Sequence, residues 1–577
     1  MKLLGAFDLL EAITIKPVQF DQPLDAGSHM NDSLAKLTDD YFDYIAECFP
    51  VMCASDEFDF LPRAERATHY YDRVDNLDRD AIWQYSSTLR KLLSRCDAMV
   101  SNENDPEKMS DLALLKANAS GILIELEQKQ SWRRNPLLYL KIAFIGLHHA
   151  LAKPAAGPEE RIRRTSARLK AIPGLLKQAV DNMDNVPIIY HQAALAMVQD
   201  GRTYLDEIKT DFTGESLRAV NRDLQESHRA LEALAHSLRR HPPVPEQPSS
   251  LSALEATLKN HFASTRTLSE IFEIAREEWR YSLERLNTLQ SEIDPGKTWQ
   301  ALYHGYSLPG TDDKDTFSLY QNEIERLERF FREHGFKGLD LSSSLELCET
   351  PTYLRSVRSS ASFSAALTAD PMEKDVFYIT TRIAGQRGDE AADLVKRRLQ
   401  REYKFLAAHE TFPGHHLLDS VRRRLDNPVR RQIESPLFYE GWAYYSESLL
   451  TEFGYVDNPM DDLVDCKRRL WRAARCQIDV GLAAGMLSRN EALELVTEAG
   501  FSPTEANHQI DHFLLNPGYQ LCYSLGRHEI MQLRKTYGSR MDLDHFHKKL
   551  LEGGQLPFHL VEKRFDASLN KETGEKP

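Results

Sequence analysis

The stretch that decides the fold is LSEIFEIAREEWRYSLERL (Leu268–Leu286), in which apolar residues return every three or four positions. This spacing places them on one stripe of an α-helix, with Glu and Arg residues on the other side. The stripe consists of Leu268, Ile271, Phe272, Ala275, Trp279, Leu283 and Leu286. Similar patterns run through Ser33–Ala46, Arg79–Val100, Lys108–Lys129 and Pro187–Ile208, and no convincing β-alternation precedes residue 340. The sequence therefore predicts a mainly α protein with a large helical body.

A proline-rich segment marks the clearest boundary in this chain of 577 residues. HPPVPEQPSS (His241–Ser250) cannot continue a helix, so we expect an extended linker there. It separates an N-terminal helical domain, 30–240, from a C-terminal domain, 251–577, that holds every chemical motif. Two short strands are expected at Ser360–Ala365 and Val376–Thr380, beside the motif helix. They form either a plain hairpin or an edge that pairs with an extended peptide.

The first 29 residues are excluded from fold reasoning, because GSHM (Gly27–Met30) looks like a cloning junction. We therefore expect the native chain to begin at Met30. The preceding residues, Met1–Ala26, are either an attached substrate or leader peptide or an arbitrary vector remnant.

The net charge of −15 argues against nucleic acid or an anionic membrane as the main partner, because both attract clustered Lys and Arg. The basic runs Arg161–Arg164 and Arg422–Arg424 are interpreted as solvated helix faces. The seven cysteines form no CxxC pair, and the N-terminus lacks the pattern of a secretory signal. No apolar run reaches the roughly 20 residues that span a bilayer. We therefore expect a cytoplasmic protein with reduced thiols.

The segment AAHETFPGHHLL (Ala407–Leu418) begins like the zinc-binding helix of a metallopeptidase, with His409 followed by Glu410. An HExxH motif has its second histidine four positions after the first, but proline occupies position 413 here. Pro413 has no N–H for the helix, and Gly414 tolerates conformations that other residues resist. The pair predicts a local widening of the helix that absorbs two extra residues.

Two histidines follow this interruption, six and seven positions after His409. On a regular helix, His415 would lie about 240° around the axis from His409, and His416 about 10.5 Å along it. Neither could then share one metal ion with His409. With two residues looped out, His415 takes the place of the usual second ligand, and His416 is the alternative.

Catalytic zinc needs three protein ligands and a nearby carboxylate that accepts a proton from water. We expect Glu410 to be this base. The third ligand is expected in SPLFYEGWAYYSESLL (Ser435–Leu450), where Glu440 follows His409 by 31 positions. Glu447, two turns further along, is expected to be a hydrogen-bond partner of a ligand. Iron, manganese or cobalt would accept the same set of ligands as Zn²⁺.

The segment NPGYQLCYSLGRHEI (Asn516–Ile530) offers Tyr519, Tyr523 and Arg527 on successive turns of one helix. Amide hydrolysis generates an oxyanion that needs a hydrogen-bond donor or a positive charge. The alternative is that both tyrosines only pack, with their hydroxyls in water.

A second pair of histidines, in NHQIDHF, has the i, i+4 spacing of zinc ligands, but no acidic motif helix accompanies it. His508 and His512 are therefore interpreted as structural residues of an amphipathic helix. Stabilisation of the substrate by His512 in the same cleft is the alternative.

The stretches HETFPGHH, EGWAYYSE and NPGYQLCYSLGRHEI resemble the HExxPGHH, EGWAxYxE and PGxxxxYxxG motifs of an uncharacterised bacterial family of unknown function. The resemblance covers most of Leu251–Leu551. This family is in turn similar, as distant kin, to the helical HExxH…E zinc oligopeptidases and carboxypeptidases of the thimet and angiotensin-converting types. The resemblance implies a deep cleft with zinc on its floor and hydrolysis of short peptides. It also implies that Tyr523 donates to the oxyanion and that Tyr519 contacts the substrate.

The leading hypothesis is a zinc metallopeptidase that hydrolyses short peptides. A second hypothesis keeps the metal, which would act on a non-peptide amide or modify a biosynthetic peptide, with Met1–Ala26 as the recognition segment. A third is a metal-free peptide-binding protein whose active site has decayed through Pro413.

Overall fold

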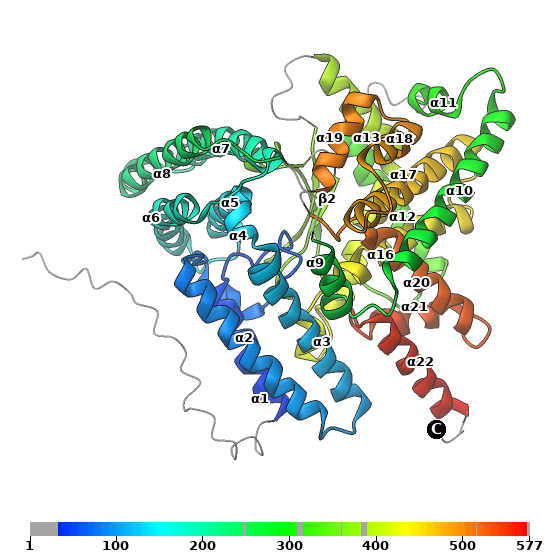
Figure 1. Ribbon diagram of the computed structural model, residues 1–577, viewed down its shortest axis with the longest axis horizontal. Helices are drawn as coiled ribbons and strands as arrows, with labels where there is room; N and C mark the ends of the chain where they lie inside the picture. The colour runs from blue at the N-terminus through cyan, green and yellow to red at the C-terminus, as the bar shows by residue number, and fades with distance from the viewer. Residues whose placement is uncertain are drawn as a thin grey trace, which may run out of the picture.

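The computed structural model describes residues 33–245, 250–307, 315–358, 361–381, 389–514 and 516–573. The segment 1–29 and part of the linker 241–250 lie outside these ranges. Helices that precede the linker lie on the left of Figure 1, and those that follow it lie on the right, with β2 between them.

The part of the chain before the linker is helical. Its helices are α1 (Leu34–Cys48), α2 (Arg79–Val100), α3 (Pro106–Ile124), α4 (Ser131–Arg134), α5 (Pro136–Ala152), α6 (Pro158–Asn182), α7 (Ile188–Lys209) and α8 (Gly214–Arg240), with a 3₁₀ turn, η2 (Glu65–Tyr70), and a π-helical turn, η3 (Glu125–Lys129). Three of the expected helices coincide with α1, α2 and α7 to within two residues, and the fourth spans α3 and η3. The helical periodicity therefore predicted these elements correctly.

The part after the linker adds a second set of helices around a small sheet. They are α9 (Leu251–Ala256), α10 (Leu268–Ile293), α11 (Trp299–Gly305), α12 (Thr316–Glu333), α13 (Asp389–Glu410), α14 (His415–Arg422), α15 (Pro428–Gln432), α16 (Pro436–Glu452), α17 (Pro459–Ala483), α18 (Arg489–Glu498), α19 (Pro503–Phe513), α20 (Leu521–Tyr537), α21 (Leu543–Leu551) and α22 (Phe558–Thr573), with η4 (Thr257–His261) and η5 (Thr352–Leu354). The mainly α class is confirmed.

Helix α10 shows why the opening stretch folds as it does. The Thr267 hydroxyl accepts a hydrogen bond from the Glu270 N–H, while the Glu270 carboxylate accepts one from the Thr267 N–H, which caps the first turn. Ile271, Ala275 and Leu286 of its apolar stripe are fully buried. The helix packs along α17, which carries many of the residues around the candidate site.

The sheet has three strands in the order β1-β3-β2. β2 (Ala361–Ser364) and β3 (Asp375–Ile379) pair antiparallel, close to the two expected strand positions. β1 (Leu345–Glu349) was not predicted; it pairs parallel to β3 and makes β3 the central strand. The expectation of a hairpin was therefore correct for two strands and incomplete for the sheet.

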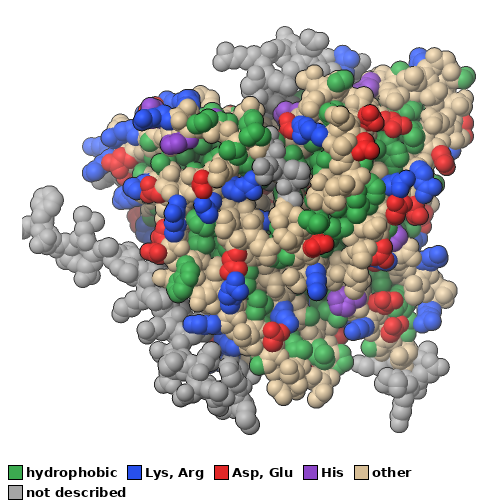
Figure 2. All heavy atoms as spheres, viewed as in Figure 1, with side chains coloured by type: hydrophobic (Ala, Val, Ile, Leu, Met, Phe, Trp, Pro, Cys, Tyr) green, Lys and Arg blue, Asp and Glu red, His purple; other side chains and the backbone are tan. Residues whose placement is uncertain are grey.

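One hydrophobic cluster contains buried residues from both sides of the linker, from Leu37 in α1 to Leu569 in α22. A backbone hydrogen bond of 2.7 Å, donated by the Arg63 N–H to the Gln432 carbonyl, also connects the two parts. Segments on either side of the linker therefore share a core, and the division into domains stays a prediction. On the face shown in Figure 2, Lys and Arg side chains are interspersed with Asp and Glu.

Candidate metal centre

The helix that carries the HE pair is interrupted at Pro413 and Gly414, but by a complete break between two helices and not by the expected local widening of one. α13 stops at Glu410, and α14 starts at His415. Gly414 lies so close to the end of α13 that a Cβ there would be 2.6 Å from the His409 carbonyl carbon, and closer still to the carbonyl oxygen. Real Cβ atoms essentially never approach within 3.0 Å of another heavy atom. Glycine is therefore required at the position where the chain turns between the two histidines.

Helix α16 holds this turn from the other side. The Pro413 carbonyl accepts hydrogen bonds from the Trp442 indole N–H at 2.9 Å and from the Ser446 hydroxyl at 3.2 Å. The peptide bond between Phe412 and Pro413 is cis. The side chains of Phe412, Pro413, Trp442 and Ser446 are all buried, so the turn belongs to the core and not to a surface loop.

The turn brings His409, His415 and Glu440 together. Glu440 Oε2 lies 3.3 Å from His409 Nε2 and 3.7 Å from His415 Nε2, and one ligand atom of each residue lies within 4.8 Å of the other two. Ligand atoms of a tetrahedral zinc ion are about 3.3 Å apart, given Zn–N distances of about 2.0–2.1 Å. The three side chains therefore fit a metal ion without large rearrangement.

Two further properties of the group fit a cation. Glu440 Oε2 is buried and has the imidazoles of His409 and His415 as its neighbours, at 3.3 and 3.7 Å. Burial opposes ionisation of Glu440, but hydrogen bonding to His409 and the nearby imidazoles outweigh it and lower the pKa of Glu440 to about 2. An ionised, buried carboxylate together with two imidazoles is a typical set of N and O ligands for zinc.

His409 is held by a second carboxylate on its other ring nitrogen. Glu447 Oε1 lies 2.7 Å from His409 Nδ1, and Glu447 itself pairs with Arg468 at 3.0 Å and with Arg472. Burial opposes protonation of His409, but the carboxylates of Glu440 and Glu447 raise its pKa to about 9. A carboxylate on the second nitrogen fixes the ring orientation of a metal-binding histidine.

His416 is turned away from the group. Its Nε2 lies 3.1 Å from Asp375 Oδ2, on the central strand β3. Between the two histidines left open by the sequence, only His415 contributes to the three-residue group, and His416 forms a buried pair with an acid instead.

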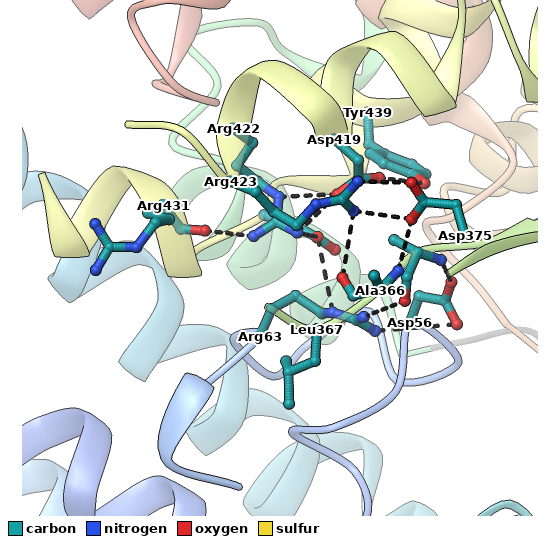
Figure 3. A network of polar contacts seen from close by, with 12 residues as sticks. Asp56, Arg63, Ala366, Leu367, Asp375, Asp419, Arg422, Arg423, Arg431 and Tyr439 are labelled. Carbon is teal, nitrogen blue, oxygen red and sulfur yellow. Dashed lines mark hydrogen bonds and ion pairs between the residues drawn. The ribbon is translucent and has the colours of Figure 1, made fainter. Parts of the chain in front are cut away.

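His415 is positioned by a ring and not by a carboxylate. The Tyr439 ring stacks on the His415 ring with centroids 3.9 Å apart, and its hydroxyl donates to Asp419 Oδ2 at 3.2 Å. Asp419 in turn accepts from the Arg422 guanidinium at 2.7 Å. Figure 3 shows Tyr439, Asp419 and Arg422 in one network of polar contacts.

This network corrects the interpretation of Arg422–Arg424 as a solvated face. Arg422 and Arg423 are buried, and Arg423 pairs with Asp375 at 2.6 Å (Figure 3), so only Arg424 is exposed. Arg422 and Arg423 can be buried because acidic side chains, Asp419 and Asp375, meet them inside the protein. In the other run, Arg161 and Arg163 are exposed as expected.

Tyr519 and Tyr523 both reach Glu440, although they do not share a helix as expected: Tyr523 lies on α20 and Tyr519 in the turn before it. Their hydroxyls donate to Glu440 Oε1, that of Tyr523 at 3.0 Å. Here they hold the Glu440 carboxylate in place. Their approach depends on Gly526, where a Cβ would lie 2.6 Å from the Gly441 Cα, so α16 and α20 touch backbone to backbone.

Glu410, Tyr523 and His512 line the same cavity of about 390 Å³, together with His409. Glu410 Oε2 accepts a hydrogen bond from the Phe363 N–H of β2 at 2.9 Å, and burial raises the pKa of Glu410 to about 7. Burial lowers the pKa of His512 to about 4, so its imidazole is neutral at physiological pH.

Arg527, which the sequence placed one turn after Tyr523 as a possible positive charge for the oxyanion, lies apart from His409, His415 and Glu440. Its Nη1 is 3.3 Å from Glu278 Oε1, and its guanidinium packs over the Tyr444 ring. It does not line the cavity. The sequence reasoning missed the cavity's basic residues on α17, although Arg468, Arg472 and Arg475 recur at helical spacing.

Two solved structures share the fold. A proposed lipoprotein of unknown function from Shewanella oneidensis has a TM-score of 0.70 at 17% identity, and a proposed lipoprotein from Colwellia psychrerythraea has 0.71 at 17%. Each comparison covers 92% of this chain and 99% of the other. Among the described residues, no helix is long and apolar enough to cross a membrane. The expectation of a cytoplasmic location gains no support from these neighbours.

No curated protein matches the chain. A sequence profile described as "Bacterial protein of unknown function (DUF885)" matches residues 63–565, which is most of the chain on both sides of the linker. The chain therefore belongs to this family of bacterial proteins of unknown function.

Proposed function

We propose that the protein is a zinc-dependent hydrolase that cleaves peptide bonds in short peptides. One observation carries the proposal. His409, His415 and Glu440 converge on one buried point, while the Glu410 carboxylate lines the cavity next to them. Zinc hydrolases use three N and O ligands for the metal and an adjacent carboxylate as the base.

His409, His415 and Glu440 would hold the ion. Zinc in this position supplies a Lewis acid that polarises a carbonyl group and makes water more acidic. The distant kinship with helical HExxH…E zinc oligopeptidases that the resemblance implies supports this choice of metal, and iron, manganese or cobalt are the alternatives.

The remaining steps belong to the chain's own residues. Glu410 accepts a proton from the attacking water and passes it to the leaving amine. Its Oε2 is held by the Phe363 N–H, so the carboxylate has a fixed orientation. Glu447 keeps the His409 ring in place, and the Tyr519 and Tyr523 hydroxyls keep Glu440 in place. In this proposal Tyr523 turns to the developing oxyanion when the substrate is bound.

The size of the cavity favours a small substrate. About 390 Å³ is within the range of about 300–1,000 Å³ that holds a small ligand. The N–H groups of Phe363 on β2 and of Ala365 just after this strand already donate hydrogen bonds to Glu410 and Asp56. Pairing of a substrate with this strand edge is therefore limited to few residues.

Two observations oppose each other on location. All seven cysteines are free thiols, which favours a reducing compartment. The two solved neighbours carry lipoprotein in their names, which favours a protein outside the cytoplasm. Detection of the native protein in the membrane or periplasmic fraction of its host would overturn the cytoplasmic expectation.

The test loads the purified protein with zinc and exposes it to a library of short peptides, with products identified by mass spectrometry. Glu410→Gln should retain one equivalent of zinc and lose hydrolysis by at least about a hundredfold, because general-base catalysis contributes about 10²–10⁴. His416→Gln is the matched control and should retain zinc, whereas His415→Ala should lose it.

The outcomes separate the three hypotheses. Less than a tenth of an equivalent of metal after loading would favour a metal-free binding protein. Bound zinc with an intact peptide backbone would favour a modifying enzyme or one that acts on another amide. Unchanged hydrolysis by Glu410→Gln would refute the proposed role of this carboxylate.

A further inference from the structure

The cavity beside the metal group is lined by more positive than negative charge. Its acidic residues are Glu402 and Glu410, whereas its basic residues are Arg358, Arg398, Lys467, Arg468, Arg472 and Arg475. A protein with a net charge of −15 thus concentrates cations at one internal surface. Such a surface favours an anionic ligand.

Most of these cations already have a carboxylate partner. Arg468 and Arg472 pair with Glu447, and Arg398 lies 3.7 Å from Glu402. Arg358 pairs with Glu57. These four therefore contribute to the structure of the site and are poor candidates for binding a ligand.

Arg475 and Lys467 differ from the others. Within the part of the chain that the structure describes, neither has a carboxylate oxygen within 4.0 Å of its side-chain nitrogens. Arg475 donates through Nε to Gln520 Oε1 at 2.7 Å, which leaves its two terminal nitrogens without an acid. Lys467 is 8% exposed and lies over the rings of Tyr303 and Phe501, at 4.8 and 4.9 Å from their centroids. Arg475 is half-buried, whereas Lys467 is buried, and burial lowers the pKa of its ammonium group to about 7, a cost that a bound anion would offset.

The position of Arg475 connects this charge to the metal group. Its guanidinium lies over the Tyr523 ring, 4.3 Å from the centroid, and the Tyr523 hydroxyl donates to Glu440 Oε1 at 3.0 Å. The planar guanidinium presents parallel N–H donors that match a carboxylate in a two-point hydrogen bond. A carboxylate bound there would therefore lie within a few residues of the bond presented to the metal group.

We infer that Arg475, assisted by Lys467, recognises a carboxylate of the substrate. The inference rests on the proposed hydrolysis and narrows its substrate class to short anionic peptides. The carboxylate comes from the free C-terminus or from an Asp or Glu side chain next to the scissile bond. Arg475 is a residue of substrate recognition in this scheme, and Glu410 remains the base.

The test uses two matched pairs of peptides. Tetra-alanine with a free C-terminus is compared with its amide, and Ala-Ala-Asp-Ala-Ala amide is compared with the Asn analogue. Binding to the zinc-loaded Glu410→Gln variant is measured by calorimetry. KM and kcat are measured with the unsubstituted, zinc-loaded protein. The first pair reports recognition of the C-terminus, and the second reports recognition of a side chain.

We expect at least one carboxylate peptide to bind more tightly than its neutral partner by roughly ten- to hundredfold, the range of a charge-assisted hydrogen bond. Arg475→Gln should remove this difference, and Lys467→Gln should reduce it. Arg475→Lys, which keeps the charge, should restore part of it. Arg276→Gln changes an exposed arginine of α10 and should leave the preference unchanged.

Equal binding of both members of each pair would overturn the inference, as would an Arg475→Gln variant that weakens neutral and anionic peptides alike. Binding does not require turnover, so the two proposals fail separately. Hydrolysis without any carboxylate preference would refute only the substrate class. Carboxylate-selective binding without hydrolysis would refute only the proposed reaction.

Discussion

Replacing Gly414 by alanine tests whether the turn between α13 and α14 sets the geometry of the metal group. The perturbation is the methyl group that alanine adds at this position. This methyl carbon would lie 2.6 Å from the His409 carbonyl carbon, below the 3.0 Å minimum for such contacts. The His409 carbonyl oxygen would lie closer still, so either the end of α13 or the start of α14 must move by more than 0.4 Å.

The expected cost follows from what the methyl group meets. Overpacking costs about 1–3 kcal/mol, and backbone atoms yield less than flexible side chains, so we expect about 2–3 kcal/mol. The shift also separates His409 from His415, and ligands must be held to within about 0.5 Å of their working geometry. Zinc affinity should therefore fall by at least about tenfold.

The sequence offers a matched control. Gly174 also follows a proline within a helical segment, in α6, but nothing lies within 4 Å of a Cβ at that position. Gly174→Ala should raise stability by about 0.5–1 kcal/mol, because alanine restricts the unfolded chain. Urea denaturation gives the midpoints, and competition with a chromophoric chelator gives the zinc affinity. Wild-type midpoint and zinc affinity in Gly414→Ala would refute the argument that this turn positions the ligands.

Three further predictions concern the same group. Tyr439→Leu should weaken zinc binding by roughly tenfold, because the ring that stacks on His415 is lost, whereas Tyr439→Phe should keep most of it. Chelator competition measures both, and equal losses would contradict positioning by the ring. Glu447→Gln should weaken zinc binding by about 10–100-fold and lower the free energy of unfolding by about 3–5 kcal/mol, since Arg468 and Arg472 lose a buried carboxylate. Unchanged affinity would show that His409 is oriented without it. Zinc at a thousand times its Kd should stabilise the fold by about 4 kcal/mol, and chelation should reverse this shift in Tm; a Tm that does not respond to zinc would argue against the site.

The residues of the candidate metal group were accessible from the sequence because their chemistry is local. Pro413 and Gly414 indicate that the helix is interrupted between two histidines. A metal site would explain why the sequence tolerates an interruption there. Glu440 was accessible because antiparallel helices return a ligand after a characteristic length of chain. The geometry now places His409, His415 and Glu440 together, while the metal itself stays a prediction.

Features that depend on distant partners were not accessible. The run Arg422–Arg424 reads as a solvated face until Asp375 and Asp419 are known to meet it inside the protein. β1 was missed because its strand partner is parallel and distant, so no turn signal joins the two. Gly526 looks like a weak helix residue, and only the contact with Gly441 shows why it is small.

The arrangement around the turn explains how an interrupted helix can still present two ligands. In an HExxH helix the regular backbone sets the distance between histidines, but here they are six positions apart, and the helix no longer fixes them. Helix α16 takes over this task. It holds the Pro413 carbonyl through Trp442, stacks Tyr439 on His415 and supplies Glu440. In this proposal one rigid helix fixes the second and third ligands together, so their relative position depends on the packing of α16 and not on the segment between α13 and α14.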